Sequence, residues 1–196
     1  MEITKRNGTT EPYDREKIAV AIRKSFASTG QEVSNEIIYS VVEEVENFVG
    51  KDTANRSVEQ IQDKVEQSLM EHGFYADAKN YILYRWQRTE RRKALNSIIN
   101  ELGDGTVMDV LKEIQKDFTT HEYSLVVLYE KFSGFCKQEM PHSERLAALI
   151  KAAVELTTQE APDWEFIAAR LLNFQLSKKL EKQAASAGIR SFYDKL

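Results

Sequence analysis

The sequence predicts a mainly α-helical protein that opens with one short β-hairpin, and three observations support this fold class. The 196 residues include only 8 glycines and 3 prolines, well below the roughly 7% and 5% of an average chain, so long helices with few turns are expected. Apolar residues recur at helical spacing through most of the chain after residue 14. The dipeptide Asn7-Gly8, placed between two short runs rich in Ile and Thr, indicates the hairpin.

The hairpin is expected to pair residues 2–6 with residues 9–13 around a type I′ turn. Both central residues of such a turn have positive φ, which Asn7 and Gly8 tolerate. An isolated hairpin is only marginally stable in water, so it should pack on a neighbouring element. Asp14 follows at once and offers the N-cap of a helix. One face of this helix carries Ile18, Ala21, Ile22 and the pair Ser25-Phe26.

Two further helices have clear termini in the sequence. One begins at Ser34 and ends at Gly50. The next begins with Ser57 and Gln60, which have the spacing of a capping box. It closes at Gly73, since glycine is favoured just after a helix C-terminus.

A fourth helix is expected to begin near Tyr75. Its residues 81–84 are apolar or aromatic all round, so most of the circumference there should be covered. The basic run 85–93 is interpreted as the solvated end of the same helix. Gly103-Asp104-Gly105 is the best linker candidate in the chain.

The second half shows helical patterns again, over residues 107–118, 122–137, 143–159 and 163–185. Ser143 is the expected N-cap of the third of these, and Pro162 interrupts the chain before the fourth. The predicted organisation is therefore a first domain over 1–93, a linker over 94–106 and a second, all-helical domain over 107–196.

Composition excludes several classes of protein. The formal net charge is −4, which argues against general binding to DNA, because that requires many neutralised phosphates. A single cysteine, Cys136, and three scattered histidines provide neither a disulfide nor a metal-ligand spacing. No signal peptide or membrane-length apolar run is present, so a cytoplasmic protein with no membrane partner is expected.

No catalytic motif is visible, so no catalytic residue and no metal ligand is assigned, and this stretch is not expected to catalyse a reaction alone. Cys136 is interpreted as a small core or half-buried residue, as free cysteines usually are.

The hairpin offers the one candidate binding site. Lys5, Arg6 and Lys17 would lie near a helix N-terminus, where cations and unpaired N–H groups together favour a phosphate. Glu11 could accept a hydrogen bond from an adenine amino group or a ribose hydroxyl. The alternative is that these charges form an ordinary solvated rim.

Two separated motifs resemble those of the ATP-cone, a small regulatory nucleotide-binding domain: Lys5-Arg6-Asn7-Gly8 with Glu11, Asp14 and Lys17-Ile18, and Tyr81-Ile82-Leu83-Tyr84-Arg85. Asn7 stands where the family usually has Asp. The resemblance implies an allosteric site for ATP or dATP, with Mg, that maintains or suppresses the activity of a larger enzyme. The site residues that it implies are Ile3, Lys5, Arg6, Glu11, Asp14, Lys17, Ile18, Val58 and Gln62. Val58 and Gln62 stand where some members present residues that touch the base.

The second half resembles the helical N-terminal domain of the large (alpha) subunit of class I ribonucleotide reductase. The resemblance rests on residues 149–156 and on the run from Ala161-Pro162-Asp163-Trp164 to Ala168-Ala169-Arg170-Leu171-Leu172. It implies an N-terminal fragment of an enzyme that reduces ribonucleoside diphosphates, truncated before the catalytic barrel and holding no redox cofactor. The implied partners are the rest of the alpha chain, a small radical-bearing beta subunit and further copies in a nucleotide-dependent oligomer. Trp164 and Phe174 remain ordinary core candidates.

The sequence leaves two other interpretations open. A nucleotide-independent assembly module would dock another subunit through the aromatic faces of residues 81–86 and 123–135. A transcriptional repressor with an ATP-cone would need a zinc ribbon before the hairpin, and the sequence starts at the strand.

A single nucleotide site, in the first half, is expected, because the second half lacks a Lys-Arg-x-Gly hairpin to neutralise a triphosphate. Replacing Lys5 and Lys17 should then abolish ATP binding, whereas replacing Lys178 and Lys179 should not.

Overall fold

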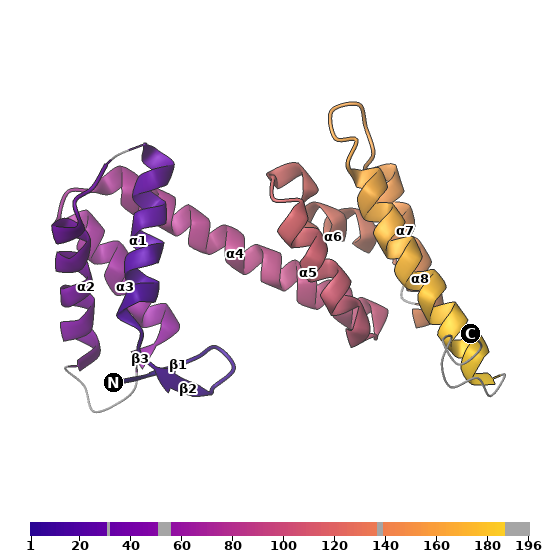
Figure 1. Cartoon of the computed structure of the whole chain (residues 1–196), viewed down its shortest axis with the longest axis horizontal. Coiled ribbons are helices and arrows are strands. Elements are labelled where there is room, and N and C mark those ends of the chain that lie inside the picture. Colours follow the sequence, from indigo (N-terminus) through magenta and orange to yellow (C-terminus); the bar gives the residue numbers. More distant parts are fainter. Residues whose placement is uncertain (31, 51–55, 137–138, 187–196) are drawn as a thin grey trace, which may run out of the picture. The chain divides into compact units, whose positions relative to one another are not determined.

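The computed structural model describes residues 1–30, 32–50, 56–136 and 139–186. It divides into two compact units, Met1–Arg88 and Thr89–Leu196, each with its own hydrophobic core. Helices dominate both units (Figure 1). The mainly α-helical fold class is therefore confirmed.

The first unit opens with a small sheet that is larger than predicted. β1 (Glu2–Thr4) pairs antiparallel with β2 (Thr10–Pro12), with Ile3 opposite Glu11. A third strand, β3 (Arg56–Ser57), pairs parallel with the other edge of β1. Sequence reasoning missed β3 because a strand of two residues has no periodicity of its own.

The hairpin turn differs from the predicted type I′. The Lys5 N–H donates to the Thr9 carbonyl at 2.7 Å, and the Gly8 N–H donates to the Lys5 carbonyl at 2.9 Å. Gly8 has φ of 81°, whereas Asn7 does not have positive φ. This is a three-residue loop closed by a glycine bulge. The Asn7 side chain explains the difference, since its Oδ1 accepts from the backbone N–H of Thr9 at 3.2 Å.

Four helices follow: α1 (Arg15–Thr29), α2 (Asn35–Gly50), α3 (Val58–Glu71) and α4 (Tyr75–Leu102), of which α4 begins in the first unit and continues into the second. Asp14 caps α1 by accepting from the Glu16 N–H at 3.0 Å, as predicted. Both bonds of the predicted capping box between Ser57 and Gln60 are present, at 2.9 and 3.2 Å. Gly73 follows α3 with φ of 81°, also as expected.

The core of the first unit lies between α1, α2, α3 and the start of α4, and Figure 1 shows the small sheet at one end of these helices. Its buried apolar residues are Ala19, Ile22, Phe26, Ile38, Val41, Val42, Val45, Val49, Ile61, Val65, Leu69, Ala78 and Tyr81. Ile3 and Ile18 pack against this core from the sheet and from α1. These contacts hold the hairpin close to the N-terminal ends of α1 and α3.

The segment expected to be a linker, 94–106, is helical as far as Leu102. Ala94, Ile98 and Leu102 recur every four residues, so they lie on one face of α4, and all three are buried in the second core. Gly103, with φ of 63°, follows the helix. The basic run is therefore internal to α4, and the two units meet between Arg88 and Thr89.

The second unit contains short 3₁₀ turns at Gly105–Val107 and His121–Tyr123 and the helices α5 (Met108–Asp117), α6 (Leu125–Ser133), α7 (His142–Glu155) and α8 (Trp164–Ser186). Residues 137 and 138, at the end of one predicted segment, lie outside the described residues.

The predicted N-cap of α7, Ser143, is wrong. α7 begins one residue earlier, at His142, and its N-cap is Pro141, which makes no side-chain cap hydrogen bond. Pro141 has φ of −60° and ψ of 144°, an extended conformation that the ring favours and that suits the residue before a helix.

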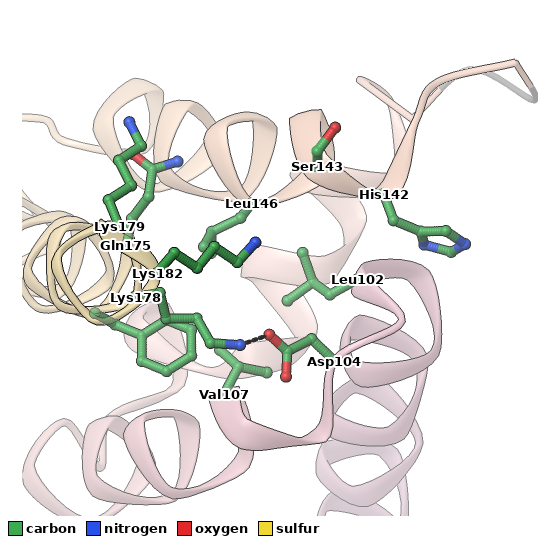
Figure 2. Close-up of a pocket in the computed structure, with 11 residues that line it drawn as sticks. Leu102, Asp104, Val107, His142, Ser143, Leu146, Gln175, Lys178, Lys179 and Lys182 are labelled. Atoms are coloured by element: carbon green, nitrogen blue, oxygen red, sulfur yellow. Dashed lines mark hydrogen bonds and ion pairs between the residues drawn. The ribbon is translucent and has the colours of Figure 1, made fainter. Parts of the chain in front are cut away.

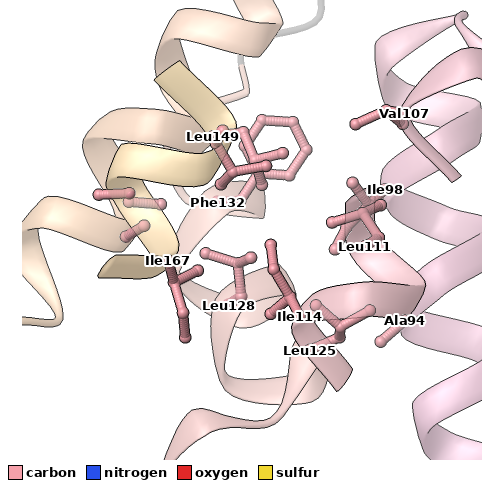
Figure 3. Packing of buried hydrophobic residues seen from close by; sticks show 14 of the residues in the cluster. Ala94, Ile98, Val107, Leu111, Ile114, Leu125, Leu128, Phe132, Leu149 and Ile167 are labelled. Carbon is pink, nitrogen blue, oxygen red and sulfur yellow. The ribbon is translucent and has the colours of Figure 1, made fainter. Parts of the chain in front are cut away.

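Apolar side chains from the end of α4 and from α5 to α8 interdigitate in the second core (Figure 3). Trp164 is almost fully buried there, as its core interpretation predicts, and Phe174 packs at the edge. Cys136 is half-buried, and burial raises the pKa of its thiol, which fits an unreactive role.

Within the described ranges, no group of His, Cys, Asp or Glu side chains is arranged to hold a metal ion. None of the helices in those ranges is both long and apolar enough to cross a membrane.

Candidate functional site

A cleft of about 200 Å³ opens in the first unit where the hairpin meets the N-terminal ends of two helices. Its lining residues come from the hairpin (Ile3, Glu11, Pro12), the start of α1 (Tyr13, Asp14, Lys17, Ile18, Ala21), α3 (Val58, Ile61, Gln62) and α4 (Tyr81, Arg88). Residues separated by more than eighty positions in the sequence therefore share one small cavity.

The structure brings the sequence-predicted residues together. All of them except Lys5 and Arg6 line the cleft. Those two side chains contact lining residues: the Lys5 ammonium is 2.6 Å from a Glu11 carboxylate oxygen, and the Arg6 guanidinium donates to Gln62 Oε1 at 3.3 Å. Arg6 also pairs with Glu59 on α3.

The two lysines differ in how firmly they are held. Lys5 is hydrogen-bonded to Glu11, and this bond, together with the charge of Lys17, holds the pKa of Glu11 below its ordinary value. The Lys17 ammonium lies 4.0 Å from both Glu11 and Asp14, and its side chain is 65% exposed. Such long, exposed contacts contribute little. Lys17 can therefore move to an incoming anion at small cost.

Two helix N-termini contribute to the same cavity. Asp14 caps α1, and Val58 is the first residue of α3. The aligned peptide dipoles place partial positive charge at both positions. Backbone and side chains therefore combine to favour a negatively charged ligand, as in other phosphate sites at helix N-termini.

Apolar and aromatic groups complete the cavity. Ile61 and Tyr81 are almost fully buried, and Ile3, Ile18 and Val58 are half-buried. Burial raises the pKa of Tyr13 to about 12, so its hydroxyl stays protonated near neutral pH. The cavity therefore offers an apolar wall beside charged side chains, the cations Lys17 and Arg88 and the carboxylates Glu11 and Asp14.

Sequence reasoning missed two lining residues on α4. Tyr81 and Arg88 are seven residues apart, which places them on one face of the helix. Arg88 belongs to the basic run interpreted above as a solvated helix end, and its seven-residue spacing from the covered Tyr81 is the sequence signal that points to the cleft instead.

Arg85, the last residue of the downstream motif, has a structural role. It donates to Asp63 at 2.6 Å and to Glu66 at 2.8 Å, both on α3. These bonds hold α4 against α3 and so fix the position of the helix from which Tyr81 and Arg88 line the cleft.

Only part of the second aromatic face proposed for assembly reaches the surface. Tyr123 is 8% exposed and Phe132 is fully buried, both in the core of the second unit, whereas Tyr129 and Phe135 are half-buried at its edge. On α4, in contrast, Trp86 is 59% exposed and Tyr84 is 41% exposed.

Comparisons with known proteins agree with this geometry. Residues 1–90 match the family model of the ATP cone domain. The whole chain is 44% identical to the ribonucleoside-diphosphate reductase subunit alpha of Treponema pallidum, of which it covers 24%, and 88% of it aligns at 31% identity with 19% of the Chlamydia muridarum subunit alpha. A vitamin B12-dependent ribonucleoside-diphosphate reductase of Thermoplasma acidophilum is 38% identical over 48% of the chain and 12% of that protein.

The chain thus spans about a quarter or less of the length of these relatives. The match to the cone family ends near the point where the first unit ends at Arg88, and the relatives named subunit alpha align along most or all of the chain. This chain accordingly belongs to the ribonucleoside-diphosphate reductase alpha subunits, and its residues 1–90 are an ATP-cone domain.

Proposed function

We propose that the cleft of the first unit binds ATP and dATP as allosteric effectors of a ribonucleotide reductase. The observation that carries this proposal is the convergence of the hairpin, two helix N-termini and α4 on one cavity. Lys5, Arg6 and Lys17 are assigned to the phosphates. Glu11 and Asp14 are assigned to the ribose or base.

Arg88 extends this assignment. It lines the same cleft from α4 as Lys17 does from α1. A guanidinium is well suited to phosphate oxygens because it presents several donors in one plane. Ile3, Ile18, Val58 and Gln62 then provide the side of the cleft that suits a flat base.

We also propose that Mg²⁺ accompanies the nucleotide. A triphosphate carries several negative charges, and Glu11 and Asp14 add two more to the cleft. No described cluster of carboxylates, histidines or cysteines is arranged to hold a metal here, so the phosphates themselves would be its main ligands.

The difference between ATP and dATP is one hydroxyl. If Glu11 or Asp14 accepts a hydrogen bond from it, the loss of that bond costs about 1.5–3 kcal/mol, or about 10- to 150-fold in affinity. A regulatory switch needs such differential contacts, because a ligand shifts an equilibrium only by its difference in affinity for the two states.

Isothermal titration calorimetry of this chain with ATP and with dATP tests the proposal. Saturable binding of both nucleotides supports it. The absence of binding at millimolar nucleotide overturns it.

For the full-length protein, we propose reduction of ribonucleoside diphosphates to deoxyribonucleotides, with a catalytic barrel in the rest of the alpha chain and a separate radical-bearing beta subunit. The relatives named subunit alpha support this arrangement, whereas the Thermoplasma relative is named as B12-dependent. Assaying the full-length protein with a beta subunit, and separately with adenosylcobalamin alone, distinguishes the two. Activity with the cobalamin alone would overturn the class I assignment.

A second function, subunit assembly, is favoured by the exposed aromatic side chains on α4, Tyr84 and Trp86. Light scattering of the chain with and without nucleotide tests it. A dimer of unchanged mass under both conditions supports nucleotide-independent assembly, and a monomer throughout excludes it. A mass that changes on adding ATP or dATP supports the nucleotide-dependent oligomer that the family resemblance implies.

A further inference from the structure

The second unit has a cleft of its own, of about 250 Å³, between the 3₁₀ turn at Gly105–Val107, the start of α7 and the second half of α8 (Figure 2). It shares no residue with the nucleotide cleft. The ATP-cone match ends before any of its lining residues.

One side of this cleft is apolar. Leu102 and Val107 are buried, and Leu146 and Phe174 are half-buried at its edge. These side chains come from α4, the 3₁₀ turn, α7 and α8. Apolar walls of this kind bind the hydrocarbon part of a ligand, because the ligand gains by leaving water.

The other side is basic. Lys178, Lys179 and Lys182 all reach it from α8. Lys178 is hydrogen-bonded to Asp104, and its ammonium also lies 5.3 Å from the centre of the Phe174 ring. Lys179 and Lys182 form no ion pair with any carboxylate of the described residues. Figure 2 shows the Lys182 ammonium extending from α8 toward Leu146 and Leu102. Positive charge therefore exceeds negative charge beside the apolar wall.

The start of α7 adds to this potential. His142 and Ser143, its first two residues, line the cleft, and Pro141 provides no side-chain cap. The first N–H groups of a helix have no partners within the helix. Uncapped, they leave the positive end of the helix dipole at the cleft.

From this juxtaposition we propose that the second unit binds a small amphipathic anion, with an apolar body against Leu146 and Phe174 and a carboxylate or phosphate monoester near Lys179 and Lys182. The single head group of this ligand distinguishes it from the triphosphate assigned to the first unit.

Nuclear magnetic resonance titration of the 196-residue chain tests this proposal. The probes are octanoate and phenyl phosphate, which separate a carboxylate from a phosphate head group. Octanol and inorganic phosphate are the controls, since each carries only one half of the chemistry. Saturable shifts of the Leu102, Val107 and Leu146 methyl signals are expected with at least one amphipathic anion.

Lys179→Gln with Lys182→Gln should weaken binding of that probe about tenfold, the effect of losing about one hydrogen bond to a charged group. The matched control is Lys112→Gln, an exposed lysine on α5 that does not line the cleft. It should leave the affinity unchanged.

Several outcomes overturn the proposal. If octanol bound as tightly as octanoate, the cleft would be an apolar patch with no preference for an anion. If inorganic phosphate gave the same shifts as phenyl phosphate, the cleft would be an anion site with no use for the apolar wall. Shifts that do not saturate, or an unchanged affinity in the double variant while its spectrum shows a folded chain, would also refute it. The nucleotide assignment is unaffected by any of these results, because no probe here is a nucleotide.

Discussion

Replacement of Lys5 and Lys17 by alanine is the decisive test of the nucleotide cleft. Both side chains are exposed, at 44% and 65%, so their removal should not unfold the first unit. Each hydrogen bond to a charged group contributes about 1.5–3 kcal/mol, so two lost phosphate contacts are expected to weaken binding by about 3 kcal/mol, or about 150-fold. Part of the gain from Lys5 is offset, because Lys5 must first give up its 2.6 Å bond to Glu11.

The assay is calorimetry with ATP on the double variant, with a thermal melt to show that the fold is retained. Lys112→Ala with Lys116→Ala, both exposed on α5, is the charge-matched control and should bind ATP normally. Replacing Lys178 and Lys179 should also leave ATP binding intact. Saturable ATP binding that survives in the first variant would refute the reasoning and place a nucleotide site in the second half.

Three further predictions concern stability. Gly8→Ala should destabilise the hairpin by about 1 kcal/mol, because φ at this position is 81°. The cost is conformational and not a steric clash, since an added Cβ meets no atom within 4 Å. The variant should also bind ATP more weakly in the same calorimetric assay, and an unchanged melting temperature would contradict the turn described. Ser57→Ala should lower the stability of the first unit by about 1 kcal/mol in urea, since it removes the capping bond to α3, and no change would mean that the cap is not formed in solution. The bond from Lys178 lowers the pKa of Asp104 from 3.8 to about 2, so this pair stabilises the second unit above about pH 4, and the stabilisation is lost as the pH falls through 2. Lys178→Met should therefore remove about 1 kcal/mol of stability at neutral pH after allowance for solvent screening. If Asp104 still titrated near 2 in that variant, Lys178 would not be the cause of the lowered pKa.

Local chemistry made the first unit largely predictable. Asp14 and Ser57 were identifiable as caps because their side chains act within two or three residues of their own position. Gly73 was identifiable because few other residues tolerate a positive φ. These interactions need no knowledge of the tertiary fold.

The errors arose where a distant or competing contact decides the outcome. Asn7 is a common turn residue, but its side chain bonds to Thr9 and the loop gains a residue. The pairing of β3 with β1 depends on a parallel contact between Ile3 and Arg56, which no local pattern encodes. The end of α4 was placed too early because basic residues at 85–93 obscured the four-residue spacing of Ala94 and Ile98.

The lysines of the second cleft also show that a distant contact can decide the role of a residue. Lys178 and Lys182 are four residues apart, so their shared helix face was visible in the sequence. Which of them is neutralised was not visible, because the carboxylate that pairs with Lys178 is Asp104, 74 positions earlier. A run of lysines at helical spacing therefore predicts a basic face, but only the fold distinguishes a lysine held in an ion pair from one that remains available to a ligand. That distinction separates Lys178 from Lys182 here, as it separates Lys5 from Lys17 in the nucleotide cleft.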